Sequence, residues 1–375
     1  MIHLYKIRVL LPGKFYRFSQ SSAVVPSLVE MNFSSAAGGK TVNCMRRNPR
    51  AKKALSENGM KRDTGAENRN VTVLKSGMNP SEQNVRENEM ERHDTMKRMK
   101  LCAFADEADP QLTGQIKALT ENQIPYIELR GLETGSAIAL SDRGAREVRA
   151  RLDESGVVVW SIGSPIGKIG IQDPFAPHVE QFRRTLEIGE ILGAKCVRMF
   201  SFYMPEEDPD RARYRDEVME RLNVLVTEAR GSGLVLCHEN EKGIYGEKAP
   251  ECLDIMQSVP GMRAVFDPAN FVQSGQETLP AWDMLAPYVE YMHIKDALAD
   301  GKVVPPGRGE GHVAEIVRSF GAQGGEVLSV EPHLAIFAGL SQLEREQRSI
   351  REDVYPSKRA AFDVAVRALR EILDT

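Results

Sequence analysis

Residues 234–240 read LVLCHEN, an apolar run that ends in histidine, glutamate and asparagine. The first residues of this run are typical of a buried strand, and the chain turns soon afterwards at a glycine. Charge at the end of a buried strand is costly unless it is paired, exposed or bound to a metal. Both the fold and the chemistry therefore depend on whether other strands of this chain end in the same way.

Eight apolar, strand-like runs of this kind occur after residue 99. They are KLCAFA (100–105), PYIELR (125–130), VVVWSIG (157–163), CVRMFSF (196–202), LVLCHEN (234–240), RAVFDPAN (263–270), EYMHIKD (290–296) and VLSVEPH (327–333). Stretches with helical periodicity lie between them or follow the last, as at 178–193, 213–233 and 357–373. Alternating strands and helices favour right-handed βαβ units and a parallel sheet.

We therefore predict an α/β protein in which residues 99–375 form a closed (β/α)8 TIM barrel. An open, doubly wound sheet is the alternative interpretation. No GxGxxG follows any of the eight runs, so the usual nucleotide-binding signature of such a sheet is missing from the sequence.

Residues 1–98 have a different composition. They carry 18 Lys and Arg against 9 Asp and Glu, whereas the rest of the chain carries 31 against 44. The segment is polar and lacks sustained periodicity, so it cannot bury enough apolar surface to offset the entropy of ordering. We predict a disordered, basic N-terminal leader. Translation from an upstream start is one interpretation of it, and a basic tail that contacts nucleic acid is another.

The composition also limits the partners and the compartment. The net charge of −4 argues against a general nucleic-acid binder. No apolar run approaches the roughly 20 residues that span a bilayer, and the N-terminus has no secretion signal. The five cysteines form no CxxC pair, which favours free thiols in a reducing compartment. We predict a cytoplasmic protein with no nucleic-acid and no membrane partner.

Four consecutive strand-like runs end in side chains that can bind a metal: Glu239, Asp267, His293 and Glu331. One βα unit separates each from the next, so in a barrel all four converge at the carboxyl ends of the strands. A single carboxylate in such a place is more often an ion-pair partner or a helix cap, but four in succession favour a metal site. Oxygen ligands with one imidazole suit Mn²⁺, Mg²⁺ or Co²⁺, and Zn²⁺ is compatible.

At this point the sequence resembles a known family. Residues from about 99 to 375 are similar to the sugar phosphate isomerase/epimerase family with the xylose isomerase-like TIM barrel. The matching stretches are FADEAD (104–109), YIELR (126–130), SIGSPIGK (161–168), VRMFSFY (197–203), HENEKGIYG (238–246), FDPANF (266–271), HIKDA (293–297), PPGRGEG (305–311) and VEPHL (330–334).

The resemblance implies that Glu239, Asp267, His293 and Glu331 bind a divalent cation and that Glu239 and Glu331 are the catalytic pair. It implies an isomerase or epimerase of a sugar, sugar phosphate or sugar acid, in carbohydrate metabolism. The glutamates would move a proton next to a carbonyl through a metal-stabilised enediolate. A metal-dependent dehydratase of an inosose- or dehydroshikimate-like substrate is the alternative. A homo-oligomer is compatible with either.

The sequence departs from several ketose epimerases at one position, since Asn270 stands where they place a histidine three residues after the aspartate ligand. An amide can hydrogen-bond a sugar hydroxyl but does not titrate, which puts a ketose 3-epimerase in doubt. Together with Asn270, we predict Arg198, Lys168, Lys295 and His333 as substrate-binding residues. A surface ion pair is the alternative role for Lys168 and Arg198.

Three further features allow weaker expectations. Glu128 could receive a proton or pair with Arg130. His238 precedes Glu239, so strand alternation directs it to the opposite face and favours a packed or hydrogen-bonded role. The glycines of residues 305–311 allow a tight loop near the site, and a phosphate cradle is one interpretation of it.

Two other functions share the fold family or the site. An abasic-site endonuclease uses a three-metal cluster rich in histidine, whereas only five histidines follow residue 100 and the barrel is acidic. A sugar-binding protein without catalysis would have no need of an intact ligand set with paired glutamates. We therefore favour the enzyme.

Overall fold

The computed structural model describes Met96, residues 98–208, 210–337 and 354–375, together with four short strands nearer the N-terminus. These strands are β1 (Lys6–Leu11), β2 (Lys14–Ser19), β3 (Asn32–Phe33) and β4 (Val42–Asn43). β1 pairs antiparallel with β2, and β3 with β4. Apart from these strands, Met96 and Arg98, the predicted leader lies outside the described residues, so its disorder stays a prediction.

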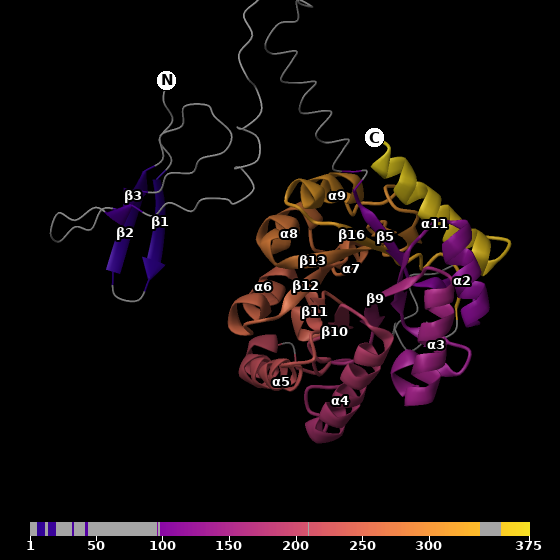
Figure 1. Ribbon diagram of the computed structural model, residues 1–375, viewed down its shortest axis with the longest axis horizontal. Coiled ribbons are helices and arrows are strands. Elements are labelled where there is room, and N and C mark those ends of the chain that lie inside the picture. Colours follow the sequence, from indigo (N-terminus) through magenta and orange to yellow (C-terminus); the bar gives the residue numbers. More distant parts are fainter. Residues whose placement is uncertain are drawn as a thin grey trace, which may run out of the picture. The chain divides into compact units, whose positions relative to one another are not determined.

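The chain divides into two compact units, Met1–Ser76 and Gly77–Thr375. In the second unit, eight parallel strands close into a barrel (Figure 1) in the order β10–β11–β12–β13–β16–β5–β6–β9. The strands are β5 (Lys100–Ala103), β6 (Tyr126–Leu129), β9 (Val158–Gly163), β10 (Cys196–Met199), β11 (Val235–Glu239), β12 (Arg263–Phe266), β13 (Val289–Ile294) and β16 (Val327–Val330). The pairing of β16 with β5 closes the ring. The predicted TIM barrel is confirmed, and the open sheet is excluded.

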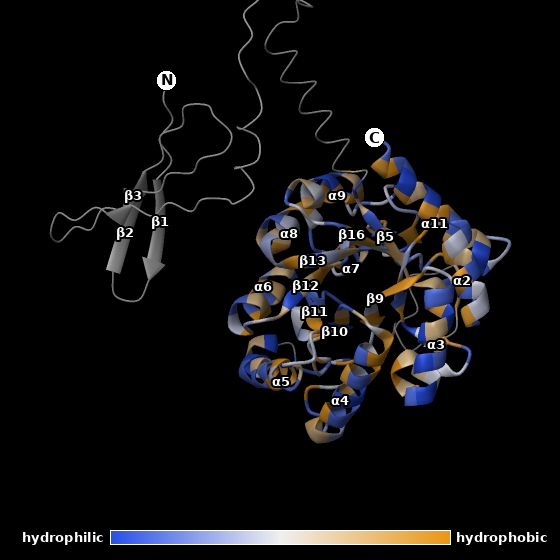
Figure 2. Cartoon of the chain, in the orientation of Figure 1, coloured by the Kyte–Doolittle hydropathy of each residue, from blue (hydrophilic) through white to orange (hydrophobic). Residues whose placement is uncertain are grey.

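Helices surround the barrel (Figure 1), and all of those described except the last, α11, lie between barrel strands along the chain. They are α2 (Leu112–Glu121), α3 (Asp142–Glu154), α4 (Phe175–Leu192), α5 (Arg215–Glu228), α6 (Ala249–Ser258), α7 (Pro268–Gln273), α8 (Thr278–Leu285), α9 (Val313–Ala322) and α11 (Lys358–Leu373). α4 ends at Gly193, whose φ of 67° favours glycine. Most of them present polar residues outward and apolar residues to the strands (Figure 2), as the periodicity predicts.

The interior of the barrel begins with an apolar layer that takes one buried side chain from each of seven strands. Its members are Cys102, Trp160, Cys196, Cys237, Val265, Tyr291 and Val327. Successive side chains on a strand alternate between faces, so the residue two positions further on points into the barrel again. Glu239, Asp267 and His293 stand two residues after Cys237, Val265 and Tyr291, so their side chains also point into the barrel, at the carboxyl ends of the strands.

Three smaller predictions can be compared with the described residues. Cys102, Cys196, Cys237 and Cys252 are free and buried, as expected. Met96 is only 5% exposed and packs in the barrel core, so the packed part of the barrel includes a residue of the predicted leader. Among the helices that the structure describes, none is long and apolar enough to cross a membrane.

Candidate active site

The four predicted metal ligands lie together. Glu239 is the last residue of β11, Asp267 directly follows β12, His293 lies in β13, and Glu331 directly follows β16. Each is at most 3% exposed. One ligand atom from each lies within 4.8 Å of the others. The convergence expected from four consecutive strand ends is therefore present in the fold.

The imidazole of His293 lies at the centre of this group. Its Nδ1 lies 3.1 Å from Oε1 of Glu239, 3.7 Å from Oε2 of Glu331 and 4.0 Å from Oδ2 of Asp267. Nδ1 of His293 is buried without a hydrogen bond of normal geometry to any described residue, whereas Oδ2 of Asp267 has the Lys295 ammonium 2.8 Å away as an ion-pair partner. A buried polar atom without a hydrogen bond is costly. An imidazole nitrogen in this state, with three carboxylates within 4.0 Å, fits the ligand set of a divalent cation.

The other nitrogen of His293 is held from behind by Glu128. His293 Nε2 lies 3.1 Å from Oε2 of Glu128. Ser329 donates a hydrogen bond to the same oxygen (2.8 Å), and Tyr291 donates one to Oε1 (2.7 Å). Burial favours a raised pKa for the Glu128 carboxyl, but the charge and hydrogen bond of His293 lower it below its usual value. A carboxylate on the far nitrogen is how metal-binding histidines are normally oriented. Glu128 therefore does not pair with Arg130, one of the two roles considered for it.

Arg130 instead forms ion pairs with three carboxylates. Sequence reasoning did not predict these pairs. Its guanidinium lies 2.9 Å from Asp106, 3.0 Å from Glu107 and 3.0 Å from Oε1 of Glu331. Burial raises the pKa of Glu107 to about 8, against the opposing charge of Arg130. The FADEAD and YIELR stretches could have indicated these ion pairs, because acidic residues follow β5 and Arg130 follows the neighbouring strand β6. Arg130 fixes one oxygen of Glu331 and leaves the other facing His293.

Lys295 lies on the face of His293, as expected, and contacts two of the four candidate ligands. Its ammonium is 2.7 Å from Oε2 of Glu331 and 2.8 Å from Oδ2 of Asp267. Burial disfavours the charged form, but the carboxylates of Asp267 and Glu331 raise the pKa of Lys295 well above its usual value. A fixed positive charge therefore lies beside the ligand cluster.

Glu239 is held by a different set of partners. Asn270 donates to Oε1 of Glu239 (3.1 Å) and to the carbonyl of Asn240 (2.9 Å), while Nε of Arg198 lies 3.3 Å from Oε2. Asn270 and Arg198 are each 2% exposed. The guanidinium of Arg198 packs over the ring of Phe200, 4.6 Å from its centroid. Asn270 and Arg198 thus orient one of the two glutamates, and the substrate contact predicted for them stays a prediction.

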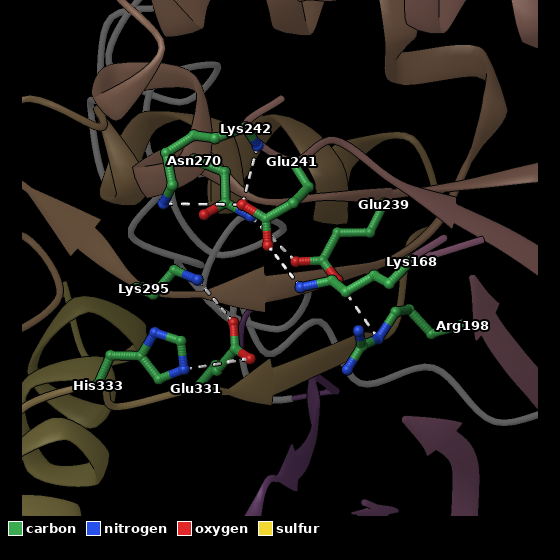
Figure 3. Close-up of a pocket in the computed structure, with 9 residues that line it drawn as sticks. All are labelled: Lys168, Arg198, Glu239, Glu241, Lys242, Asn270, Lys295, Glu331 and His333. Carbon is green, nitrogen blue, oxygen red and sulfur yellow. Dashed lines mark hydrogen bonds and ion pairs between the residues drawn. The ribbon is translucent and has the colours of Figure 1, made fainter. Parts of the chain in front are cut away.

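A pocket opens above the cluster. Figure 3 shows the side chains that line it: Lys168, Arg198, Glu239, Glu241, Lys242, Asn270, Lys295, Glu331 and His333. All five predicted substrate-binding residues are among them. Sequence reasoning missed Glu241 and Lys242, although both stand in the HENEKGIYG stretch directly after Glu239.

The outer wall of this pocket is an ion cluster. Nζ of Lys168 lies 3.0 Å from Oε2 of Glu241, and Nζ of Lys242 lies 3.7 Å from Oε1. Burial favours a raised pKa for Glu241, but the charges of Lys168, Lys242 and Lys295 lower it to about 2. Lys168 also packs over Phe200, 4.4 Å from the ring centroid. Its ion pair is buried rather than at the surface.

His333 and His238 have different surroundings. Nε2 of His333 lies 3.4 Å from Glu107 and 3.6 Å from Oε1 of Glu331, and burial lowers its pKa well below the usual value. His238 points away from the cluster and hydrogen-bonds Ser201 at 2.9 Å. Burial lowers the pKa of His238 to about 3. The packed, hydrogen-bonded role expected for His238 is what the structure has.

The glycine loop of residues 305–311 wraps a side chain of the protein itself. The backbone amides of Gly307, Gly309 and Gly311 each donate to the Asp296 carboxylate at 2.9 Å. A Cβ on Gly309 would approach the carbonyl oxygen of Ala297 to 2.4 Å, so this close packing needs glycine. The loop is therefore a carboxylate cradle that Asp296 fills, and the phosphate interpretation is wrong for these three amides.

Comparisons with known proteins agree with this architecture. A family model described as xylose isomerase-like TIM barrel matches residues 116–353. Among curated proteins, none matches the chain significantly.

Three solved structures illustrate the likeness. The probable 3-DHS dehydratase AsbF from Bacillus anthracis is 15% identical, with 72% of this chain and 98% of that one covered and a TM-score of 0.55. D-psicose 3-epimerase from Clostridium cellulolyticum H10 is 16% identical, with 74% of this chain and 100% of that one covered and a TM-score of 0.57. A xylose isomerase-like TIM barrel protein from Mycobacterium smegmatis, in complex with magnesium, is 16% identical, with 74% of this chain and 96% of that one covered and a TM-score of 0.53. At such identities the likeness establishes the fold alone.

Proposed function

Because the chain belongs to the xylose isomerase-like TIM barrel family, we propose that it is a divalent-metal-dependent isomerase or epimerase. Its substrate is a sugar, sugar phosphate or sugar acid, and the reaction moves a proton on the carbon next to a carbonyl. The observation that carries the proposal is the convergence of four ligand atoms within 4.8 Å at the carboxyl ends of the strands, where enzymes of this fold place their active sites.

Glu239, Asp267, His293 and Glu331 would hold the cation. The donor set suits Mn²⁺, Mg²⁺ or Co²⁺ and accepts Zn²⁺. When bound, such a cation polarises the carbonyl oxygen and stabilises the negative charge that develops on it. Glu128 orients His293 through its far nitrogen, so Nδ1 faces the centre of the cluster.

Glu239 and Glu331 are the proton-transfer pair in this proposal. They stand on the outer two of four neighbouring strands, β11, β12, β13 and β16, so a substrate bound between them meets one carboxylate from each side. Arg130 holds one oxygen of Glu331, and Asn270 holds one oxygen of Glu239. A positioned carboxylate that removes a proton from one face, with a second that returns it, accomplishes epimerisation or isomerisation.

A dehydratase is the second candidate, and Asn270 favours it over a ketose 3-epimerase. This amide is committed to Glu239 and to a backbone carbonyl, and it cannot titrate. The B. anthracis neighbour, named a probable 3-DHS dehydratase, has the same fold. Both reactions begin with the same proton abstraction, and they differ in whether a hydroxyl group then leaves as water.

We place this activity in carbohydrate metabolism in the cytoplasm, where four buried free cysteines suit a reducing environment. A homo-oligomer is compatible with the barrel. The assignment to carbohydrate metabolism rests on the proposed reaction, and the assignment to the cytoplasm rests on the free thiols.

The test is proton exchange with solvent. Metal-loaded protein is incubated in D₂O with ketoses, inososes and sugar phosphates, and NMR follows deuterium entry at each carbon. Deuterium next to the carbonyl supports the proposal, and loss of a hydroxyl in the same sample identifies the dehydratase. Glu239→Gln and Glu331→Gln should each lose about 10²–10⁴ in rate while metal stays bound. The exposed Glu154 of α3 supplies the matched control, Glu154→Gln, which should keep the parent rate. Near-parental turnover in both active-site variants would refute the paired glutamates.

A further inference from the structure

The outer wall of the pocket carries positive charge that the proton transfer does not use. Lys168 and Lys242 bracket one carboxylate, Glu241, each near a different oxygen. The Lys168 side chain is 5% exposed and that of Lys242 is 36% exposed, so one ammonium is built into the wall and the other stands at the opening. Among the described residues, this part of the pocket combines two ammonium groups with one carboxylate, which together carry a charge of +1.

The wall is held in a fixed arrangement. Phe200 packs beneath Lys168, and Gln273 accepts a hydrogen bond from the Lys242 ammonium. Glu241 also accepts from the backbone amide of Lys242 at 2.8 Å. The same pocket reaches Glu239 and Glu331 at its inner end. A small molecule that meets the two glutamates with one end therefore brings its other end to the two lysines.

The anion that suits this wall is a carboxylate rather than a phosphate ester. A phosphate dianion is typically bound by several backbone amides in a glycine-rich turn. In the described part of the chain, the glycine loop of residues 305–311 is such a turn, and it already encloses Asp296. Among the described residues of the outer wall, two lysines stand beside the carboxylate of Glu241, so their charges together can balance one further negative charge.

We propose that the substrate is a sugar acid whose carboxylate binds between Lys168 and Lys242, while its carbonyl end meets Glu239 and Glu331. This inference rests on the proposed function and narrows its substrate class. Glu241 holds the two lysines in place in the free protein and shares them with the incoming carboxylate.

Three hexuloses that differ only at C6 test the charge directly: D-fructose, D-fructuronate and D-fructose 6-phosphate. Isothermal titration calorimetry measures each on the metal-loaded full chain. Fructuronate should bind about tenfold or more tighter than fructose, since one charged hydrogen bond contributes that much. Lys168→Met and Lys242→Met should each remove this advantage, so that each variant binds fructuronate no more tightly than fructose. Glu241→Gln should tighten fructuronate, because it removes a competing carboxylate.

The exposed Lys248 is a matched control, because Lys248→Met makes the same charge change away from the pocket and should alter nothing. Tighter binding of the phosphate ester with the same dependence on the lysines would overturn the choice of carboxylate. Equal binding of all three sugars, or no binding of any, would overturn the anionic substrate. Calorimetry needs no turnover, so the two proposals can fail separately. If fructuronate binds more tightly than fructose but no deuterium enters the substrate, only the proposed proton transfer is refuted. If deuterium enters but the three sugars bind equally, only the proposed sugar-acid substrate is refuted.

Discussion

Replacing Arg130 by methionine removes a cation that three buried carboxylates share. The guanidinium is 8% exposed, contacts Asp106, Glu107 and Glu331, and lies between two aromatic rings. The ring centroids of Phe104 and Phe337 are 4.3 and 4.7 Å from its central carbon. Methionine preserves much of the apolar contact but none of the charge. The variant therefore isolates the electrostatic part of this arrangement.

The expected loss is large, because removing one partner of a buried ion pair costs about 3–5 kcal/mol. For a barrel of this size, about 2 °C of melting temperature corresponds to 1 kcal/mol. Arg130→Met should therefore melt about 6–10 °C below the parent. Lysine restores the charge but not the fork of donors, so Arg130→Lys should recover only part of the loss. A divalent cation should stabilise Arg130→Met more than the parent, because it supplies positive charge beside Glu331.

Calorimetric melting with and without Mn²⁺ or Mg²⁺ makes the measurement. Arg143 on α3 gives the matched control, because its pair with Glu147 is exposed, with side chains 88% and 63% accessible. Arg143→Met should change the free energy of unfolding by less than about 1 kcal/mol. If Arg130→Met melts within 2 °C of the parent, or if the cation stabilises both proteins equally, then Arg130 does not support Glu331 in the way argued.

Three further predictions concern the layers around the cluster. Asp267→Asn and His293→Ala should retain the fold but lose tight metal binding, so unchanged metal content by elemental analysis would refute the assignment. Glu128→Gln should weaken metal affinity about 10–100-fold, because it removes the carboxylate behind His293, and a metal titration checks this. His238 has a pKa of about 3 in the folded protein against 6.5 in the unfolded chain. Its contribution to the free energy of unfolding is therefore complete above pH 6.5 and is lost as the pH falls toward 3. At pH 5 that loss is about 2 kcal/mol, and denaturant unfolding of His238→Gln at pH 7.5 and 5 should show a correspondingly smaller pH dependence.

The barrel and the convergence of four side chains could be predicted because each depends on local periodicity. Apolar runs of strand length mark the strands, and the ionisable residue after the apolar part of each later run marks where the strand reaches the active-site end. Glu239, Asp267 and Glu331 stand at those points in their own segments, and His293 lies one residue before the end of β13. No long-range contact has to be known to place any of them at the same end of the barrel.

The partners of these residues could not be predicted, because closure of the ring brings together segments that are distant in sequence. Arg130 stands two residues after Glu128 and is its natural partner in the sequence, yet Glu128 contacts His293, 165 residues away. Arg130 reaches Glu331 across 201 residues. The glycine loop failed for a related reason, since its anion is supplied by Asp296 from within the chain. Sequence patterns identify donors and acceptors, and the topology decides how they pair.

The order of the layers inside the barrel explains why its parts can be tested separately. An apolar layer that includes Tyr291 supports Glu128, which orients His293, and His293 faces the carboxylates that would hold the cation. Beyond these lie the lysines of the outer wall. A change in a deeper layer acts on the cation through His293, because Glu128 is buried and does not line the pocket. In the proposed binding mode, a change in the outer wall meets the ligand directly. Substitution of Glu128 should therefore alter metal affinity without changing the preference among the C6 groups, whereas substitution of Lys242 should do the reverse.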